Sequence, residues 1–318
     1  MPLDHYISQV HLRNFYSPAL GDLMYAIRKS DLKRFPCNSE SVCRIEEGNT
    51  NAYLIHDRAI EDFLVGVEPK YNASVVKLRN SKIDPECIYA VAGFAAYVAC
   101  CAPAAMRIHT RPLQSMLESG AAIIDKQGLL PRAPTSLGSK SLSELLASGT
   151  VRFDVDQKYP QALGISAIIN YVSIWGNSRW EILKNDDSKS PFFTSDFPVA
   201  IEKTRDRRVL ARIIPLAPDL AIRIIPDLRL SRTSPDLSFA KFSCEERVLR
   251  HYEILEINRL IVRCTEDTIF YRDNHEWIGN FVAKNRHYRI EAITERIPHG
   301  TGFLNVSTQR IVSFRPDA

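Results

Sequence analysis

Residues 180–225 read WEILKNDDSKSPFFTSDFPVAIEKTRDRRVLARIIPLAPDLAIRII. Short runs rich in β-branched and aromatic residues alternate here with Pro and Asp, a pattern typical of strands separated by turns. The runs cover residues 180–183, 192–194, 199–201, 209–214 and 220–225. The stretch therefore predicts an antiparallel or mixed sheet.

The half of the chain before this stretch carries helical patterns. Apolar residues recur at helical spacing over residues 58–79, where Pro69 should kink or divide the helix. Ser8 is placed to cap a short helix that carries Val10, Leu12 and Phe15. Further helices are expected at residues 85–102, 111–119, 160–174 and 244–264, and a strand at 310–314 could return to the same sheet. Helices first and strands later predict an α+β fold, with a mainly helical N-terminal half packed on a sheet from the C-terminal half.

Gly, Pro, Ser and Thr concentrate in residues 127–150, which is loop composition. This segment is the predicted boundary between a helical region, residues 1–126, and an α+β region, residues 151–318. We expect the two regions to share one core.

The net charge of +4 comes from one segment of the chain. Residues 200–232 hold eight basic and four acidic side chains, and the difference equals the whole excess. Such a stretch can attract phosphates, with Arg205, Arg207 and Arg208 as the candidate contacts. The alternative is a solvated hairpin of mixed charge.

The seven cysteines form no CxxC pair, so neither a zinc ribbon nor a disulfide framework is expected. This usage fits a reducing cytoplasm, and we expect a cytoplasmic protein. Residues 87–106 lack charge and reach membrane-spanning length, but they are rich in Ala and contain Gly93 and Pro103. A buried helix in a soluble protein is the prediction, with no membrane partner.

Two separate stretches resemble one family. Residues 5–15, HYISQVHLRNF, resemble the signature HYVPQxxLRxF of the family known as domain of unknown function 4238, and residues 193–199, FTSDFPV, resemble its FxTSDNPV. Weaker matches are PLAP at 215–218, a helix with Glu61 and Glu68, and Asn258. Ser8, Phe197 and Cys101 stand where the family has Pro, Asn and often Arg. The resemblance implies a fold and a cluster of polar residues, and it implies no reaction.

The first signature supplies candidate catalytic residues. His5, Gln9 and Arg13 recur at steps of four, so they share one face if the segment is helical. His5 could act as acid or base and Arg13 could bind a phosphate, with Gln9 and Asn14 as substrate contacts. Alternatively, these side chains only hold the fold together.

Asp196 stands at a predicted strand end beside a turn that Pro198 helps to fix. Such a carboxylate can orient a base or bind a metal, with Ser195 as a substrate contact, or it can satisfy turn amides. Glu61 and Glu68 lie two helical turns apart and could bind a metal or divide acid and base roles, although exposed glutamates are commoner. No residue is assigned as a metal ligand; the cofactor is unknown, and a divalent metal stays open.

The sequence contains no P-loop, GxGxxG, HExxH or GxSxG motif, which argues against nucleotide-driven motors, Rossmann dehydrogenases and common serine hydrolases. The leading hypothesis is a hydrolase acting on a phosphate-bearing substrate, with RNA or DNA as candidates, hence a nuclease. His5, Arg13 and Asp196 would then meet in one cleft. The competing hypothesis is a non-catalytic binding or regulatory module in which the same residues lock the two halves together.

Overall fold

The computed structural model describes residues 3–230, 234–300 and 302–314. The predicted run of strands forms a five-stranded sheet, and the α+β class is confirmed. Its strands, in spatial order, are β10 (Ser243–Val248), β5 (Arg179–Lys184), β9 (Leu220–Ile225), β8 (Leu210–Ala217) and β7 (Ala200–Lys203). Only the β10–β5 pair is parallel, so the sheet is mixed.

Residues 192–194 do not join this sheet. The strand there, β6 (Thr194–Ser195), pairs with β11 (Thr268–Tyr271) instead. The four-stranded sheet that results also contains β2 (Met24–Arg28) and β3 (Arg34–Cys37). β1 (Leu3–His5) and β4 (Arg44–Glu46) form a separate antiparallel pair. The N-terminal fifty residues thus hold short strands where a mainly helical region had been expected. These strands pair with one another and, through β2, with the distant β11.

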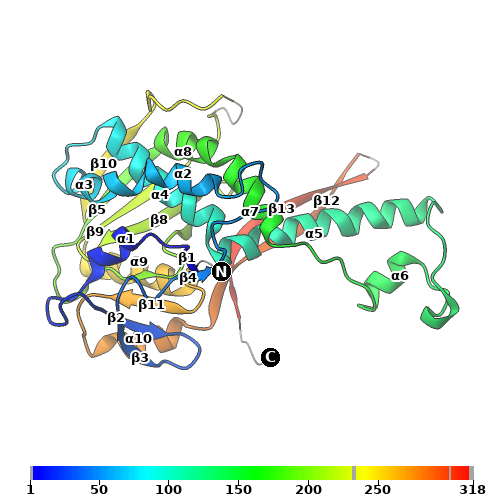
Figure 1. Ribbon diagram of the computed structural model, residues 1–318, viewed down its shortest axis with the longest axis horizontal. Helices are drawn as coiled ribbons and strands as arrows, with labels where there is room; N and C mark the ends of the chain where they lie inside the picture. Colours follow the sequence, from blue (N-terminus) through cyan, green and yellow to red (C-terminus); the bar gives the residue numbers. More distant parts are fainter. Residues whose placement is uncertain (1–2, 231–233, 301, 315–318) are drawn as a thin grey trace.

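Helices cover one face of the five-stranded sheet (Figure 1). They are α2 (Ala59–Val65), α3 (Glu68–Arg79), α4 (Pro85–Cys101) and α8 (Ile168–Gly176). The predicted division at Pro69 is confirmed, because α3 begins with that proline in its first turn. Gly93 allows α4 to approach the α2–α3 junction closely, since a Cβ there would lie 2.8 Å from Val67 Cγ2.

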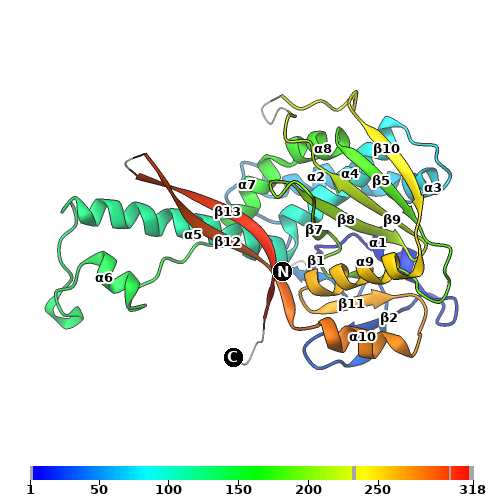
Figure 2. The ribbon, with the colours of Figure 1, turned by 180° about the vertical axis from the view of Figure 1, so that it is seen from behind.

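The opposite face of the sheet packs against α9 (His251–Cys264), and α10 (Trp277–Asn285) lies beyond it (Figure 2). The prediction of one helix over residues 244–264 was wrong at its start, because residues 243–248 form β10. This strand is at the sheet edge, so its side chains are mostly exposed and polar. Glu245 and Glu246 form ion pairs with Arg179 and Lys184 of the neighbouring strand.

An arm projects from the body (Figures 1 and 2). It consists of α5 (Pro103–Lys126), α6 (Leu142–Ala147), and the antiparallel ribbon of β12 (Tyr288–His299) and β13 (Gly302–Ser313). The strand expected at 310–314 therefore belongs to this ribbon and not to the main sheet. The helix expected at 111–119 is part of the longer α5, and α6 interrupts the loop expected at 127–150.

The remaining short elements are α1 (Gln9–Leu12), η1 (Arg13–Phe15), η2 (Thr135–Leu137) and α7 (Lys158–Ser166). A single cluster of buried apolar side chains includes residues from both sides of the 127–150 segment, for example Leu12, Val91 and Ile182.

The uncharged segment is a buried helix, as predicted: most residues of α4 are buried. Among the residues that the structure describes, no single helix is both long and apolar enough to cross a membrane. Only α4 and α5 taken together reach the required length and composition, and they are bent by 60° relative to each other.

Candidate functional site

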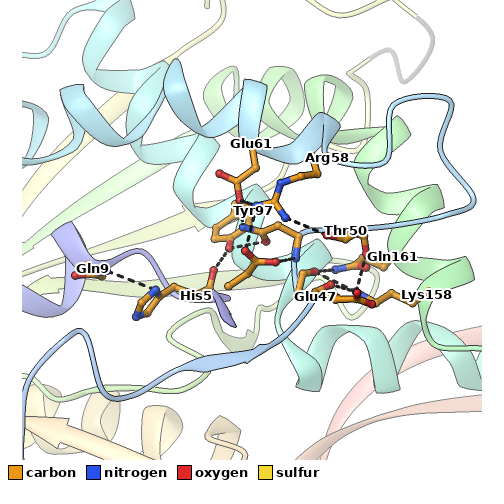
Figure 3. A network of polar contacts seen from close by, with 12 residues as sticks. His5, Gln9, Glu47, Thr50, Arg58, Glu61, Tyr97, Lys158 and Gln161 are labelled. Carbon is orange, nitrogen blue, oxygen red and sulfur yellow. Dashed lines mark hydrogen bonds and ion pairs between the residues drawn. The ribbon is translucent and has the colours of Figure 1, made fainter. Parts of the chain in front are cut away.

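His5, Gln9 and Arg13 form a chain of contacts at the N-terminus. His5 ends strand β1, and its Nδ1 lies 3.5 Å from Gln9 Nε2 (Figure 3). Arg13 donates a hydrogen bond of 3.1 Å to Gln9 Oε1 on the exposed surface. The three residues therefore come together, although His5 precedes the helix.

The hydrogen bonds define how His5 can act. Gln9 Nε2 can only donate, so this contact of 3.5 Å assigns the acceptor role to His5 Nδ1 and, in a neutral ring, the proton to Nε2. His5 Nε2 is buried and has no hydrogen-bond partner among the described residues. Neither ring nitrogen is thus open to a substrate in this conformation.

A polar network lies behind His5, with Tyr97 of α4 at its centre (Figure 3). The Tyr97 hydroxyl donates to the carbonyl oxygen of His5 and lies 3.2 Å from Asn49 Oδ1. Asn49 in turn donates from its backbone to Asp4 at 3.0 Å and from its side chain to Glu61 at 2.6 Å. Because its members come from β1, α2, α4 and the loop after β4, the network fixes the N-terminal strand onto the helical layer.

Lys158 of α7 holds the loop that follows β4. Its Nζ donates to the carbonyl oxygens of Glu47, Gly48 and Thr50 at 2.6, 3.2 and 3.0 Å. Burial lowers the pKa of Lys158, and the Cys101 side chain lies near its ammonium group. A cation therefore lies beside the position where the family resemblance implies Arg, but its hydrogen bonds go to backbone.

The two glutamates of the resemblance lie on separate helices, Glu61 on α2 and Glu68 on α3. Both nevertheless bind groups of the N-terminal half: Glu61 accepts from Arg58 and Asn49, and Glu68 accepts from the Ser8 hydroxyl. Within residues 3–230, 234–300 and 302–314, no three His, Cys, Asp or Glu side chains are grouped to hold a metal ion. The described residues thus offer a divalent metal no ready ligand set.

Asp196 binds a turn and not His5. Its carboxylate accepts hydrogen bonds from the backbone N–H groups of Glu266, Asp267 and Thr268 at 2.9, 2.8 and 2.8 Å. Burial raises the pKa of Asp196 to about 6, while these three N–H groups and the Lys29 ammonium oppose the shift. In the part of the chain that the structure describes, no hydrogen bond or ion pair joins Asp196 to His5 or Arg13. The hydrogen bonds of Asp196 thus go to the turn at residues 266–268 and not to the other two predicted catalytic residues.

Ser195 and Asn14, expected as substrate contacts, are also engaged inside the protein. Ser195 is fully buried, and its Oγ accepts from the backbone N–H of Phe197 at 3.1 Å. Asn14 donates to Asn72 and to the carbonyl oxygen of Leu216, each at 3.2 Å. The latter contact joins the N-terminal signature to the PLAP turn.

The basic candidates occupy an exposed turn between β7 and β8. Arg205, Arg207 and Arg208 all face solvent there. Arg208 forms two hydrogen bonds with the Asp206 carboxylate, of 3.0 and 2.7 Å. For the described residues, no contact connects this turn with the His5 network.

His11 is the signature residue that the sequence analysis missed. It is fully buried, with Nδ1 2.8 Å from the Tyr71 hydroxyl and Nε2 2.7 Å from Thr194 Oγ1, and its ring stacks on Phe94 at 4.6 Å. Burial lowers the pKa of His11 to about 3, so the ring stays neutral. Its spacing of four from the apolar Phe15 was the available sign that it faces the core.

A hollow between α9 and α10 lies outside every predicted site. Its volume is about 390 Å³, and its lining includes Ser190, His251, Leu255, Trp277, Phe281 and Lys284. A wider open hollow adjoins it at Trp277 and Asn280 and includes Lys189 and His275. No motif in the sequence indicated this region, because the lining comes from three separate segments.

Ser190, His251 and Asp187 meet at the edge of this hollow without forming a catalytic relay. Both Ser190 Oγ, at 3.1 Å, and Asp187 Oδ2, at 2.8 Å, contact the same imidazole nitrogen, Nδ1. In a serine hydrolase the serine and the carboxylate bind opposite nitrogens, so that the ring can pass a proton between them. The present arrangement orients His251 but does not activate Ser190.

Comparison with known proteins gives one match. A family model described as "Protein of unknown function (DUF4238)" matches residues 4–275 of the 318, which confirms the resemblance of the two signature stretches. No curated protein and no solved structure matches the chain.

Proposed function

We propose that this chain, which belongs to the DUF4238 family, is a non-catalytic binding module whose signature residues hold the two halves together. The ligand site is the hollow between α9 and α10. The observation that carries the proposal is that both oxygens of the Asp196 carboxylate are occupied by backbone N–H groups.

The state of the histidines supports the same reading. A general base needs a ring nitrogen within hydrogen-bond reach of the proton that it removes. His5 Nδ1 faces Gln9 and its Nε2 is buried, while both nitrogens of His11 have protein partners. Neither of these two histidines has a nitrogen open to a bound substrate.

A hydrolase acting on a phosphate-bearing substrate, a nuclease included, is the second candidate. It is favoured by the exposed guanidinium groups of Arg205 and Arg207, for which no ion pair with a described residue is present. Such groups can bind phosphate oxygens. On this alternative, replacing both with Ala should weaken binding to RNA or DNA and flatten its salt dependence.

The discriminating experiment is a set of turnover assays on the purified full chain. Substrates are bis-p-nitrophenyl phosphate, p-nitrophenyl phosphate, and single- and double-stranded RNA and DNA, each with and without Mg²⁺ or Mn²⁺. We expect the wild-type chain to turn over each substrate no faster than the His5→Gln variant does. Turnover that His5→Gln abolishes at an unchanged melting temperature would establish an enzyme and overturn the proposal.

A further inference from the structure

The hollow between α9 and α10 has a rigid aromatic wall. The Trp277 ring stacks on Phe193 with centroids 5.6 Å apart and an interplanar angle of 25°, and the Phe281 ring lies perpendicular to it with centroids 5.4 Å apart. The indole Nε1 donates to the carbonyl oxygen of Lys189 at 3.1 Å. Because these contacts fix the indole plane, the wall is formed before any ligand arrives.

The rim of the hollow carries cations. Lys284 lines it directly, and Lys189 lines the adjoining hollow. Neither ammonium group forms an ion pair with a residue in the described ranges, whereas the nearby Asp187 is already bound to His251. Glu276 is the one acidic side chain in the lining of either hollow. In the smaller hollow, Lys284 is the only Lys, Arg, Asp or Glu among the described lining residues, so the fixed charge at its rim is positive and favours an anion.

The size and lining limit the ligand. A volume of about 390 Å³ is at the small end of the range typical of ligand sites, roughly 300–1,000 Å³. Leu255, Trp277 and Phe281 offer apolar and ring surface, on which a flat ring stacks well. Ser190 and Asn280 add neutral polar groups at the edge.

We propose that this hollow binds a small aromatic anion, with its ring against Trp277 and Phe281 and its negative group beside Lys284. The inference rests on the proposed function, because it names the ligand class of the same site. It requires no bond to form or break.

The test uses Trp277 as its own reporter. Trp175 and Trp180 are buried in the core, so the partly exposed Trp277 should carry most of the ligand-dependent change in fluorescence. Phenylacetate, phenyl phosphate, benzyl alcohol and phenethylamine are titrated into the full chain with excitation at the red edge of indole absorption. They share a phenyl ring and differ in the charge and kind of their polar group.

We expect saturable binding of phenylacetate or phenyl phosphate, at least tenfold tighter than that of phenethylamine. The two anions distinguish a carboxylate from a phosphate ligand. Lys284→Gln should weaken binding of the anion about fivefold or more and leave benzyl alcohol unchanged. Lys82→Gln, an exposed lysine just after α3, is the matched control and should change neither.

Two outcomes would count against the inference, and a third would count against the proposed function alone. Equal or tighter binding of benzyl alcohol or phenethylamine overturns the anion but leaves a binding module standing. Absence of saturable binding by all four compounds overturns the inference at this hollow. Hydrolysis of p-nitrophenyl acetate that Ser190→Ala removes overturns the non-catalytic proposal, while an anion preference measured alongside it would still stand.

Discussion

The Nε2 atom of His11 lies 2.7 Å from Thr194 Oγ1, so the two signature stretches meet inside the protein although 183 positions separate them. His11 ties α1 to β6, and through Tyr71 it also contacts α3. The signatures thus share a buried contact through residues other than the pair, His5 and Asp196, for which a meeting had been expected.

The buried neutral His11 should make the protein less stable in acid. Its folded pKa is about 3, against 6.5 for an exposed histidine, so the unfolded chain takes up a proton first. Stability is then lost as the pH falls from 6.5 towards 3, by up to about 1.4 kcal/mol per pH unit. Urea unfolding of wild type and His11→Phe between pH 4 and 7 checks this. The unfolding free energy of the variant should fall less steeply with decreasing pH than that of the wild type. Equal slopes would show that His11 is not held neutral.

Asp196→Asn should destabilise the protein by about 2–3 kcal/mol at pH 7, since an amide N–H₂ would face backbone donors that now bind a carboxylate. Chemical denaturation measures the loss, and Asp206→Asn, in an exposed turn, is the matched control. Because no hydrogen bond or ion pair joins His5 to Asp196 among the described residues, the losses of unfolding free energy from Asp196→Asn and His5→Ala should add within about 0.5 kcal/mol in the double variant. A coupling energy well above that value would restore the paired site.

Tyr97→Phe should cost about 1–2 kcal/mol of unfolding free energy, because it removes only the hydroxyl at the centre of the network and leaves two buried acceptors without it. Thermal and urea unfolding provide the measurement. Tyr53→Phe removes an exposed hydroxyl that binds Asp156, and it should leave stability unchanged. If both variants behave alike, the network does not stabilise the N-terminal strand.

Lys29 should give the protein an alkaline stability gain. Burial lowers its pKa to about 8, although its ammonium donates to the carbonyl oxygens of Thr265 and Tyr288 at 2.6 and 2.8 Å. The unfolded chain holds that proton up to about pH 10.5, so stability should rise between pH 8 and 10.5. Tyrosines also titrate in this pH range. The measurement is therefore the slope of the unfolding free energy against pH, compared between wild type and Lys29→Met. The prediction fails if Lys29→Met retains the full slope.

Local patterns were sufficient where an element's own residues decide its structure. Pro69 divides a helix because it lacks the N–H that a helix interior needs, and the apolar runs on β5, β8 and β9 are buried on a central sheet. β10 was not predicted because this edge strand has mostly exposed, polar side chains. Its strand conformation depends on pairing with β5. The ribbon strands likewise depend on α5, which lies far away in the sequence.

The candidate site was harder to predict than the fold. His5, Gln9 and Arg13 could be placed together because they are local in sequence, and the basic turn could be recognised from its charge. The partners of Asp196 could not be predicted, because they are backbone N–H groups of residues 266–268, which almost any residue type supplies. The hollow at Trp277 combines segments near residues 190, 251 and 280, and no spacing rule connects them.

The arm can form only after the C-terminal ribbon has been synthesised. Ser119 of α5 accepts hydrogen bonds from Arg296 and Asn305, which follow it by 177 and 186 positions. At about 5–20 residues per second, a ribosome delivers the ribbon roughly 10–35 s after that helix. Throughout that interval the side of α5 that packs on the ribbon has no packing partner. Met116, Ile123 and Ile124 of α5 are exposed even in the folded protein. The nascent chain thus exposes the apolar side of a long amphipathic helix until the last part of the chain has been synthesised.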